Sequence, residues 1–213
     1  FRVGGPADIL VQPKGTELAA VIRLCRKYDV PYQVIGNGSN LLVGDRGIRG
    51  LVIEMLSKED EICVEDDCIT VGAGMLLSKT ANRAADHGLT GMEFAAGIPG
   101  SIGGAVVMNA GAYGGEMKDI LTAVTVLDQE GNEKILSAEE LELGYRTSCI
   151  LKKGYIVTGA KIKLKHGEET AIRARMEELK KQRVEKQPLE YPSAGSTFKR
   201  PEGYFAGKLI MDA

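Results

Sequence analysis

The sequence predicts an α+β fold with a large first lobe and the start of a second one. Three features support this prediction: an early strand-helix-strand unit, a run of short strands after it, and a late change to a charged helix and a Pro- and Gly-rich segment. The chain has 213 residues. Two lobes suit this length slightly better than one, because domains commonly contain about 100–200 residues.

The first unit spans residues 8–36. Asp8 to Gln12 is a predicted strand, and Thr16 is the expected N-cap of a helix that Pro31 ends. One face of that helix is apolar and consists of Leu18, Val21, Ile22, Cys25 and Tyr28. The strand YQVIG follows, so the two strands are expected to form a parallel pair.

Extended segments dominate residues 41–165. They are LLVGD, LVIE, EICVE, CITVGAG, TAVTVLD and YIVTGAKIKLK. Asp66 and Asp67 form a predicted turn between two of these strands. Helices are expected at Leu76 to His87, which Gly88 ends, and near Ala138 to Leu143.

The last part of the chain changes character. Glu168 to Gln187 is a charged helix with Ile172, Met176 and Leu179 facing inward, and the segment after it contains too much proline and glycine for a helix. We therefore expect a first lobe over residues 1–165, with subdomains at about 1–54 and 55–165, and the start of a second lobe over 166–213. The chain lacks an initial Met and stops after KLIMDA, which suggests a fragment of a longer protein.

Composition narrows the class of partner. Hydrophobic residues make up 44% of the chain, charged residues 26%, and the net charge is −2, so no broad field attracts nucleic acid or an anionic membrane. No apolar run reaches the roughly 18 residues of a membrane span, and no signal peptide is visible. We expect a cytoplasmic protein with a small-molecule partner. Four scattered cysteines and two histidines argue against a metal site or a Ser-His-Asp triad.

The first candidate binding segment is GNGSN, Gly36 to Asn40, directly after a predicted strand. Closely spaced glycines can turn several backbone N–H groups toward one point and bind phosphate without a side-chain cation. A tight turn between strands explains five residues equally well. A Rossmann fingerprint would need a sixth-position glycine that opens a helix, but Leu41 stands there before an extended segment. The G-K-[ST] tripeptide of a P-loop does not occur.

The second candidate segment holds seven positions of interest: Gly97, Ile98, Pro99, Gly100, Ser101, Gly103 and Gly104. Pro99-Gly100 predicts a turn, and Ser101 is the expected N-cap of a short helix that runs to about Met108. Its backbone amides and dipole can hold an anion, and the two later glycines leave one face bare for a flat ligand. Close packing of helix on sheet is the alternative. Two uncharged segments in one lobe favour an extended diphosphate ligand.

Charge is supplied elsewhere in the sequence. Arg146, in GYRTS, is a fixed cation after a predicted short helix, although a lone arginine most often forms a surface ion pair. Ser196 lies in SAGSTFKRP with Lys199 and Arg200 close behind it. Most loop serines are only solvated or capping residues. A hydroxyl can nevertheless donate a proton where nearby cations stabilise the anion that it leaves.

These motifs resemble one enzyme family. FRVGGPA, VIGNGSNLLV, EFAAGIPGSIGGAVVMNAGAYGGE, GYRTS and PLEYPSAGSTFKRP, in that order, are similar to the motifs of UDP-N-acetylenolpyruvoylglucosamine reductases. The resemblance implies a two-part FAD-binding lobe of the vanillyl-alcohol-oxidase type, followed by a substrate-binding lobe. It also implies that the enolpyruvyl ether of UDP-N-acetylglucosamine is reduced to UDP-N-acetylmuramate with NADPH, through FAD, for peptidoglycan synthesis.

The resemblance also implies roles for individual residues. Gly36, Asn37, Gly38, Ser39 and Asn40 match the segment that holds the FAD pyrophosphate, and residues 97–104 match a second wall of that site. Arg146 matches the active-site arginine and Ser196 the proton donor, while Lys199 and Arg200 fall where the family approaches the charged groups of the substrate. The family's further active-site glutamate has no counterpart before residue 213, so the activity of this chain by itself stays open. Neither histidine lies beside the glycine loops, which favours non-covalent FAD.

Two other functions stay open at this point. The chain can be a flavin oxidase of the same fold that acts on another substrate, or a non-enzymatic module that binds a nucleotide sugar. Rapid bleaching of the bound flavin by anaerobic NADPH would exclude a pure oxidase. A Ser196→Ala variant of the full-length protein would separate the reductase from the binding module, because only proton transfer would be lost.

Overall fold

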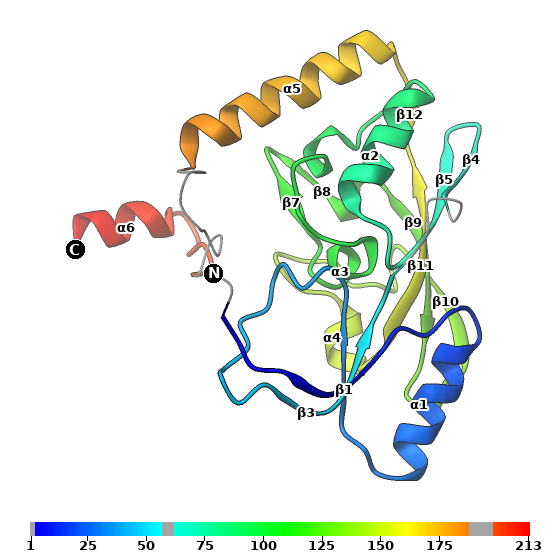
Figure 1. Ribbon diagram of the computed structural model, residues 1–213. Helices are drawn as coiled ribbons and strands as arrows, with labels where there is room; N and C mark the ends of the chain where they lie inside the picture. The colour runs from blue at the N-terminus through cyan, green and yellow to red at the C-terminus, as the bar shows by residue number, and fades with distance from the viewer. Residues whose placement is uncertain (1–2, 57–61, 188–197) are drawn as a thin grey trace.

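The computed structural model describes residues 3–56, 62–187 and 198–213. A small parallel sheet and a larger antiparallel sheet, with short helices around them, make up most of the molecule (Figure 1). No helix in the described ranges is both long and apolar enough to cross a membrane.

The N-terminal sheet has three parallel strands in the order β1-β3-β2. Its elements are β1 (Ala7–Val11), α1 (Glu17–Lys27), β2 (Tyr32–Ile35) and β3 (Ile48–Glu54). The expected direct pairing of the first two strands is wrong, because β3 lies between them and pairs with both. Leu18, Ile22 and Cys25 of α1 are buried as predicted, whereas Tyr28 follows the helix as its C-cap and is 65% exposed.

Beside this sheet, one local expectation is confirmed in position and another fails. Thr16 stands at the N-cap of α1 without a side-chain cap bond, and the Glu17 carboxylate instead accepts a hydrogen bond from the Lys14 N–H at 2.8 Å. The segment LLVGD is a loop, not a strand. The Gly44 carbonyl accepts hydrogen bonds from the N–H groups of Gly5 and Gly47, so this backbone is paired across a turn.

The larger sheet has five antiparallel strands in the order β10-β9-β11-β5-β4. Its strands are β4 (Ile62–Glu65), β5 (Cys68–Gly72), β9 (Leu121–Leu127), β10 (Glu133–Ser137) and β11 (Ile156–Lys163). These confirm the predicted strands, and Asp66 makes the turn between β4 and β5 with a left-handed φ of 53°. A two-residue strand, β12 (Lys165–His166), pairs with β6 (Leu89–Thr90).

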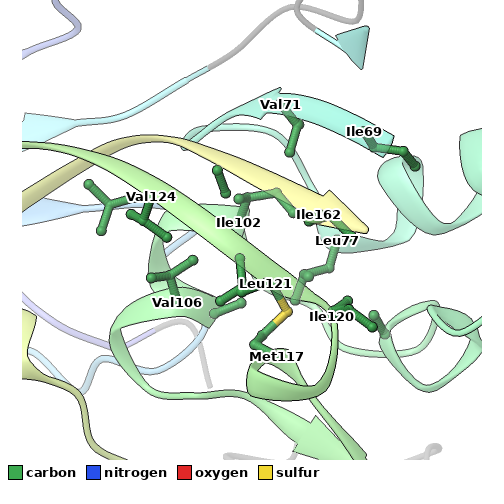
Figure 2. Close-up of a cluster of buried hydrophobic side chains, with 14 of the residues drawn as sticks. Ile69, Val71, Leu77, Ile102, Val106, Met117, Ile120, Leu121, Val124 and Ile162 are labelled. Atoms are coloured by element: carbon green, nitrogen blue, oxygen red, sulfur yellow. The ribbon is translucent and has the colours of Figure 1, made fainter. Parts of the chain in front are cut away.

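Short helices and a small hairpin cover one side of this sheet. They are α2 (Leu77–Asp86), η2 (Glu93–Ala95), α3 (Ile102–Val107), β7 (Gly111–Ala112), β8 (Gly115–Glu116), η3 (Met117–Asp119) and α4 (Cys149–Lys153). Gly88 follows α2 with a φ of 65°, as the predicted stop requires. Figure 2 shows Ile102 and Val106 of α3 among Val124 and Ile162 of the sheet, so the core fixes the position of α3.

The helix expected near Ala138 to Leu143 is absent, and residues 138–142 form a hydrogen-bonded turn. The Ser137 and Glu140 side chains bond to each other's backbone N–H groups, at 2.8 Å and 3.4 Å. Glu142 then takes a left-handed φ of 48°, which ends the turn. A single capped turn that no further helical turn extends is too short to form a helix.

The charged helix α5 (Glu169–Lys186) packs against η2 and α2. Ile172 and Leu179 are buried and Met176 packs on the core, as predicted. After the gap at residues 188–197, the chain continues to α6 (Ala206–Asp212), which lies apart from the sheets in Figure 1. The division into subdomains at about 1–54 and 55–165, with a second lobe from residue 166, stays a prediction.

Candidate functional site

The two glycine-rich segments lie against each other. The loop Gly36–Asn40 follows β2, and the side-chain amide of Asn37 donates a hydrogen bond to the Pro99 carbonyl at 2.9 Å. A Cβ on Gly36 would lie 2.0 Å from the Ser101 Oγ, so only glycine permits this close approach. The fold therefore joins the two segments, which are far apart in the sequence, into one candidate site.

The backbone of the first segment offers unpaired donors. Gly38 has a φ of 65°, and its carbonyl accepts a hydrogen bond from the Leu41 N–H at 3.3 Å. Within the described part of the chain, the N–H groups of Gly38, Ser39 and Asn40 donate to no protein acceptor, and all three residues are exposed. Three consecutive free amides in one turn can bind an anionic group without a cation.

The second segment departs from the expectation of an anion at the start of its helix. The N–H groups of Ile102 and Gly103 donate to the carbonyls of Met75, at 2.8 Å, and Ala73, at 2.7 Å. The Ser101 hydroxyl caps α3 and accepts a hydrogen bond from the Gly104 N–H at 3.5 Å. The prediction that these amides hold an anion is wrong, because α3 begins against the chain that leaves β5 and its donors are already used.

Gly103 and Gly104 have different surroundings. A Cβ on Gly103 would lie 3.0 Å from the Ala73 Cβ, so this glycine serves the close packing of α3 beside the sheet. Gly104 is exposed, and among the described residues only the Ser101 Oγ lies near the place of its Cβ, at 3.5 Å. The bare helix surface predicted for a flat ligand is therefore limited to Gly104, while the preceding stretch 97–100 is exposed or partly exposed and carries the Arg183 side chain on Gly97.

Arg146 lies in a tight turn that does not follow a helix. Gly144 and Thr147 close the turn with two reciprocal backbone hydrogen bonds, at 3.1 Å and 3.3 Å. Arg146 has a φ of 56°, a conformation that costs a residue with a side chain about 1–2 kcal/mol. Its guanidinium donates to the carbonyls of Asn109, at 3.4 Å, and Gly111, at 3.1 Å. The remaining N–H donors of the guanidinium can bind an anionic ligand.

The segment after the gap touches this turn. The Arg200 N–H donates to the Tyr145 hydroxyl at 3.3 Å, and the Arg200 side chain stacks on Phe205 at 4.1 Å and bonds to the Tyr204 carbonyl at 3.2 Å. Lys199 is exposed. Ser196 lies outside the described residues. The structure thus brings Arg200 close to the Arg146 turn through Tyr145.

A cavity of about 370 Å³ lies next to Gly97 and Tyr113, between α2, η2 and α5. Its charged side chains are already paired inside the chain: Glu93 with Thr90 and Gly91, Arg173 with Asp86 and Glu169, Glu177 with Lys180, and Arg183 with the Gly97 carbonyl. Paired charges offer little to a ligand, so the glycine segments and the Arg146 turn form the better candidate site.

Two residues of this region were not predicted from the sequence. Asn109 is fully buried and bonds to both the guanidinium and the turn of Arg146, and Tyr145 bonds to Arg200. Asn109 gave one usable signal, since a lone asparagine after the apolar helix VVM is typical of a left-handed helix end. Its partners in the Arg146 turn, however, lie 35 and 37 residues away in the sequence.

Comparisons with known proteins point to one family. Residues 7–137 match a family model described as an FAD binding domain. The UDP-N-acetylenolpyruvoylglucosamine reductases of Clostridium perfringens (strain SM101) and Clostridium tetani are 56% and 57% identical over the whole chain, which spans 70% and 69% of their lengths.

Solved structures agree. UDP-N-acetylenolpyruvylglucosamine reductase from Thermus caldophilus matches with a TM-score of 0.81 and 42% identity, over 99% of this chain and 74% of that one. Glucooligosaccharide oxidase from Acremonium strictum matches with a TM-score of 0.59 and 20% identity, over 76% of this chain and 36% of that one, and shares the fold alone. The family match and both structures confirm the predicted α+β, vanillyl-alcohol-oxidase-like fold.

Proposed function

This chain belongs to the UDP-N-acetylenolpyruvoylglucosamine reductase family, and we propose that it carries out the reaction of that family. It reduces the enolpyruvyl ether of UDP-N-acetylglucosamine to UDP-N-acetylmuramate with NADPH and FAD, a step of peptidoglycan precursor synthesis. The observation that carries the proposal is the placement of Arg146 on the same glycine-rich motif that meets the Gly36–Asn40 loop.

The residues present fit FAD. Gly38, Ser39 and Asn40 would hold its pyrophosphate with their free amides, and Gly36 and Asn37 keep this loop against Pro99 and Ser101. The exposed or partly exposed stretch from Gly97 to Gly100, with Gly104, would form the second wall of the cofactor site. Gly103 supports that wall by packing on Ala73. When bound, FAD supplies hydride transfer from NADPH to the enolpyruvyl group.

Arg146 would bind the carboxylate of the enolpyruvyl group. Negative charge develops on this carboxylate and the adjacent carbon as the double bond is reduced, and a fixed guanidinium stabilises it. Two carbonyls and a strained turn hold Arg146 in place before substrate arrives, so little reorganisation is needed. Ser196 would then donate a proton to the adjacent carbon. Lys199 and Arg200 would bind charged groups of the nucleotide sugar.

Three further properties belong to this proposal. FAD is bound without a covalent link, the protein works in the cytoplasm, and nucleic acid is not a partner. The net charge of −2 supports the last point, because it provides no attraction for a polyanion. Acid precipitation tests the first point: non-covalent FAD stays in the supernatant, while a yellow pellet would contradict it.

Anaerobic half-reactions test the function. NADPH should bleach the flavin of the purified, FAD-loaded protein, and the enolpyruvyl nucleotide sugar should then restore its colour. In a Ser196→Ala variant, bleaching should be unchanged while recolouring slows by roughly 10²–10⁴-fold, since only proton transfer is lost. A flavin that NADPH bleaches but the enolpyruvyl substrate cannot reoxidise would contradict the proposed reaction.

A further inference from the structure

Asn109 forms a buried hub beside the candidate active site. It follows α3 with a left-handed φ of 40°, and its N–H donates to the Val106 carbonyl at 3.2 Å. This conformation ends a helix and suits asparagine better than most residues. A helix end alone, however, needs no particular side-chain contact, and the Asn109 side chain is 0% exposed.

The side-chain amide of Asn109 links three segments. Its Nδ2 donates to the Glu116 carboxylate at 2.9 Å and to the Gly144 carbonyl at 3.1 Å, and its Oδ1 accepts from the Lys118 N–H at 2.9 Å. Both amide donors and the carbonyl are therefore used. Only a neutral amide provides two donors and an acceptor in this arrangement.

Two contacts of Asn109, one of its side chain and one of its backbone, hold Arg146 from opposite ends. The Asn109 side chain holds Gly144, the first residue of the Arg146 turn, while the Asn109 backbone carbonyl accepts a hydrogen bond from the Arg146 guanidinium. Asn109 thus holds both the turn that carries Arg146 and the guanidinium group of Arg146. A second buried residue, Ser148, holds the other flank of the turn by donating to the Val107 carbonyl at 2.8 Å.

We propose that Asn109 is a positioning residue for substrate reduction, which sets where Arg146 meets the carboxylate of the enolpyruvyl group. The inference rests on the proposed function of Arg146, but it concerns contacts that the chain makes by itself. A displacement of about 1 Å in a group that orients substrate can cost about 10²-fold in rate. The contacts of Asn109 oppose such a displacement, because they end directly on the turn and on the guanidinium.

The test compares three variants of the FAD-loaded protein. Asn109→Asp keeps the shape but sets a carboxylate against Glu116 and the Gly144 carbonyl. Asn109→Gly suits the left-handed backbone and removes only the side chain, so it serves if the first variant does not fold. Asp128→Asn is the matched control, because it alters another buried polar residue, in the turn between β9 and β10.

In both Asn109 variants we expect flavin reduction by NADPH at the wild-type rate and reoxidation by the enolpyruvyl substrate slowed by about 10- to 100-fold. Asp128→Asn should match wild type in both half-reactions. Reoxidation at the wild-type rate in the Asn109 variants would overturn the positioning role. A wild-type flavin that the substrate does not reoxidise would instead contradict the proposed function, so the two failures are distinct.

Hydrogen exchange gives a readout that does not need turnover. The N–H groups of Gly144 and Thr147, which bond to each other's carbonyls, should exchange faster in the Asn109 variants, while the amides of β9 and β11 should not change. Unchanged exchange at Gly144 and Thr147 would overturn the proposal.

The double variant Asn109→Asp/Glu116→Gln separates the contact of residue 109 with Glu116 from its contact with Gly144. It restores a donor and an acceptor between positions 109 and 116 but leaves two oxygens facing each other at Gly144. We expect stability to recover and slow reoxidation to persist. Full recovery of the reoxidation rate would show that the Gly144 contact is dispensable and would overturn the proposal.

Discussion

Asp128 and Asn109 are two buried polar residues that each organise a turn, but their partners differ in sequence distance. Asp128 accepts hydrogen bonds from the N–H groups of Glu130, at 3.0 Å, and Asn132, at 2.9 Å, and pairs with Lys134 at 3.1 Å. All of these partners belong to the β9–β10 hairpin. Asn109 instead bonds to Gly144, which lies 35 residues away.

The Asp128 turn is stabilised by residues of its own hairpin, whereas the Arg146 turn is held in place by Asn109, a residue of another element. The Asp128 network fixes one hairpin and reaches no candidate site residue. The Asn109 network fixes how the Arg146 turn lies on the β7–β8 hairpin, and thereby where a cation stands. Loss of the Asp128 network should lower stability, whereas loss of the Asn109 network should slow flavin reoxidation by the enolpyruvyl substrate.

The largest expected effect is on the arginine that the Asn109 hub holds. Arg146→Ala should slow flavin reoxidation by the enolpyruvyl substrate by about 10²–10³-fold, because the developing negative charge loses its fixed partner. Reduction by NADPH should not change. Stopped-flow absorbance of the flavin measures both steps.

Arg26→Ala is the matched control for that experiment. The Arg26 guanidinium pairs with the exposed Glu130 in the Asp128 turn at 2.5 Å, and exposed ion pairs contribute little to stability. We expect no change in either half-reaction. Equal effects of the two arginine substitutions would remove the distinction between the two turns.

The next effect concerns acid stability and belongs to Asp128. The pKa of its carboxyl is lowered from 3.8 to about 2, first by the hydrogen bond from the Asn132 backbone, with further contributions from Lys134 and Glu130. A lowered pKa stabilises the folded state above pH 3.8, and this contribution is lost as the pH falls toward 2. Urea denaturation midpoints should therefore fall less between pH 5 and pH 2 in Asp128→Asn than in wild type. An identical acid dependence in the two proteins would contradict this account.

Glycine substitutions in the Asp128 turn and in the β7–β8 hairpin give a smaller effect. Gly131, in the Asp128 turn, has a φ of 75°, and a Cβ there would lie 3.0 Å from the Ala19 carbonyl oxygen. Gly131→Ala should reduce the free energy of unfolding by about 1–2 kcal/mol without changing either half-reaction.

Gly114→Ala, in the β7–β8 hairpin, has similar strain at a φ of 87° but open space around it. It should cost about 1 kcal/mol and also slow reoxidation, and a purely structural effect of both substitutions would argue against the comparison.

The smallest effect lies within position 146 itself. Alanine keeps the unfavourable left-handed conformation of Arg146, whereas glycine adopts it freely. The free energy of unfolding of Arg146→Gly should therefore exceed that of Arg146→Ala by about 1 kcal/mol, although both variants lose the cation. Equal stabilities in denaturant titrations would mean that the turn carries no strain.

Sequence reasoning succeeded where the physical cause is local. The stop of α2 at Gly88, the N-cap role of Ser101 and the alternating strands of the larger sheet all follow from neighbouring residues, and all are confirmed. It failed at residues 138–143, where good helix formers make a single turn, and in the order of the parallel strands, which depends on β3. The anion site at α3 failed for a related reason, since Ala73 and Met75 take its donors.

The sequence by itself determined the family, the α+β fold and the identity of the two glycine segments, because glycine content, periodicity and motif order are properties of the chain. Only the tertiary structure decided that Gly36 meets Ser101, that the free amides lie in Gly38 to Asn40, and that Asn109 holds the Arg146 turn. These contacts depend on which hydrogen-bond donors and acceptors are already used by distant segments. A donor that is free in the sequence becomes a binding group only where the fold leaves it without a partner.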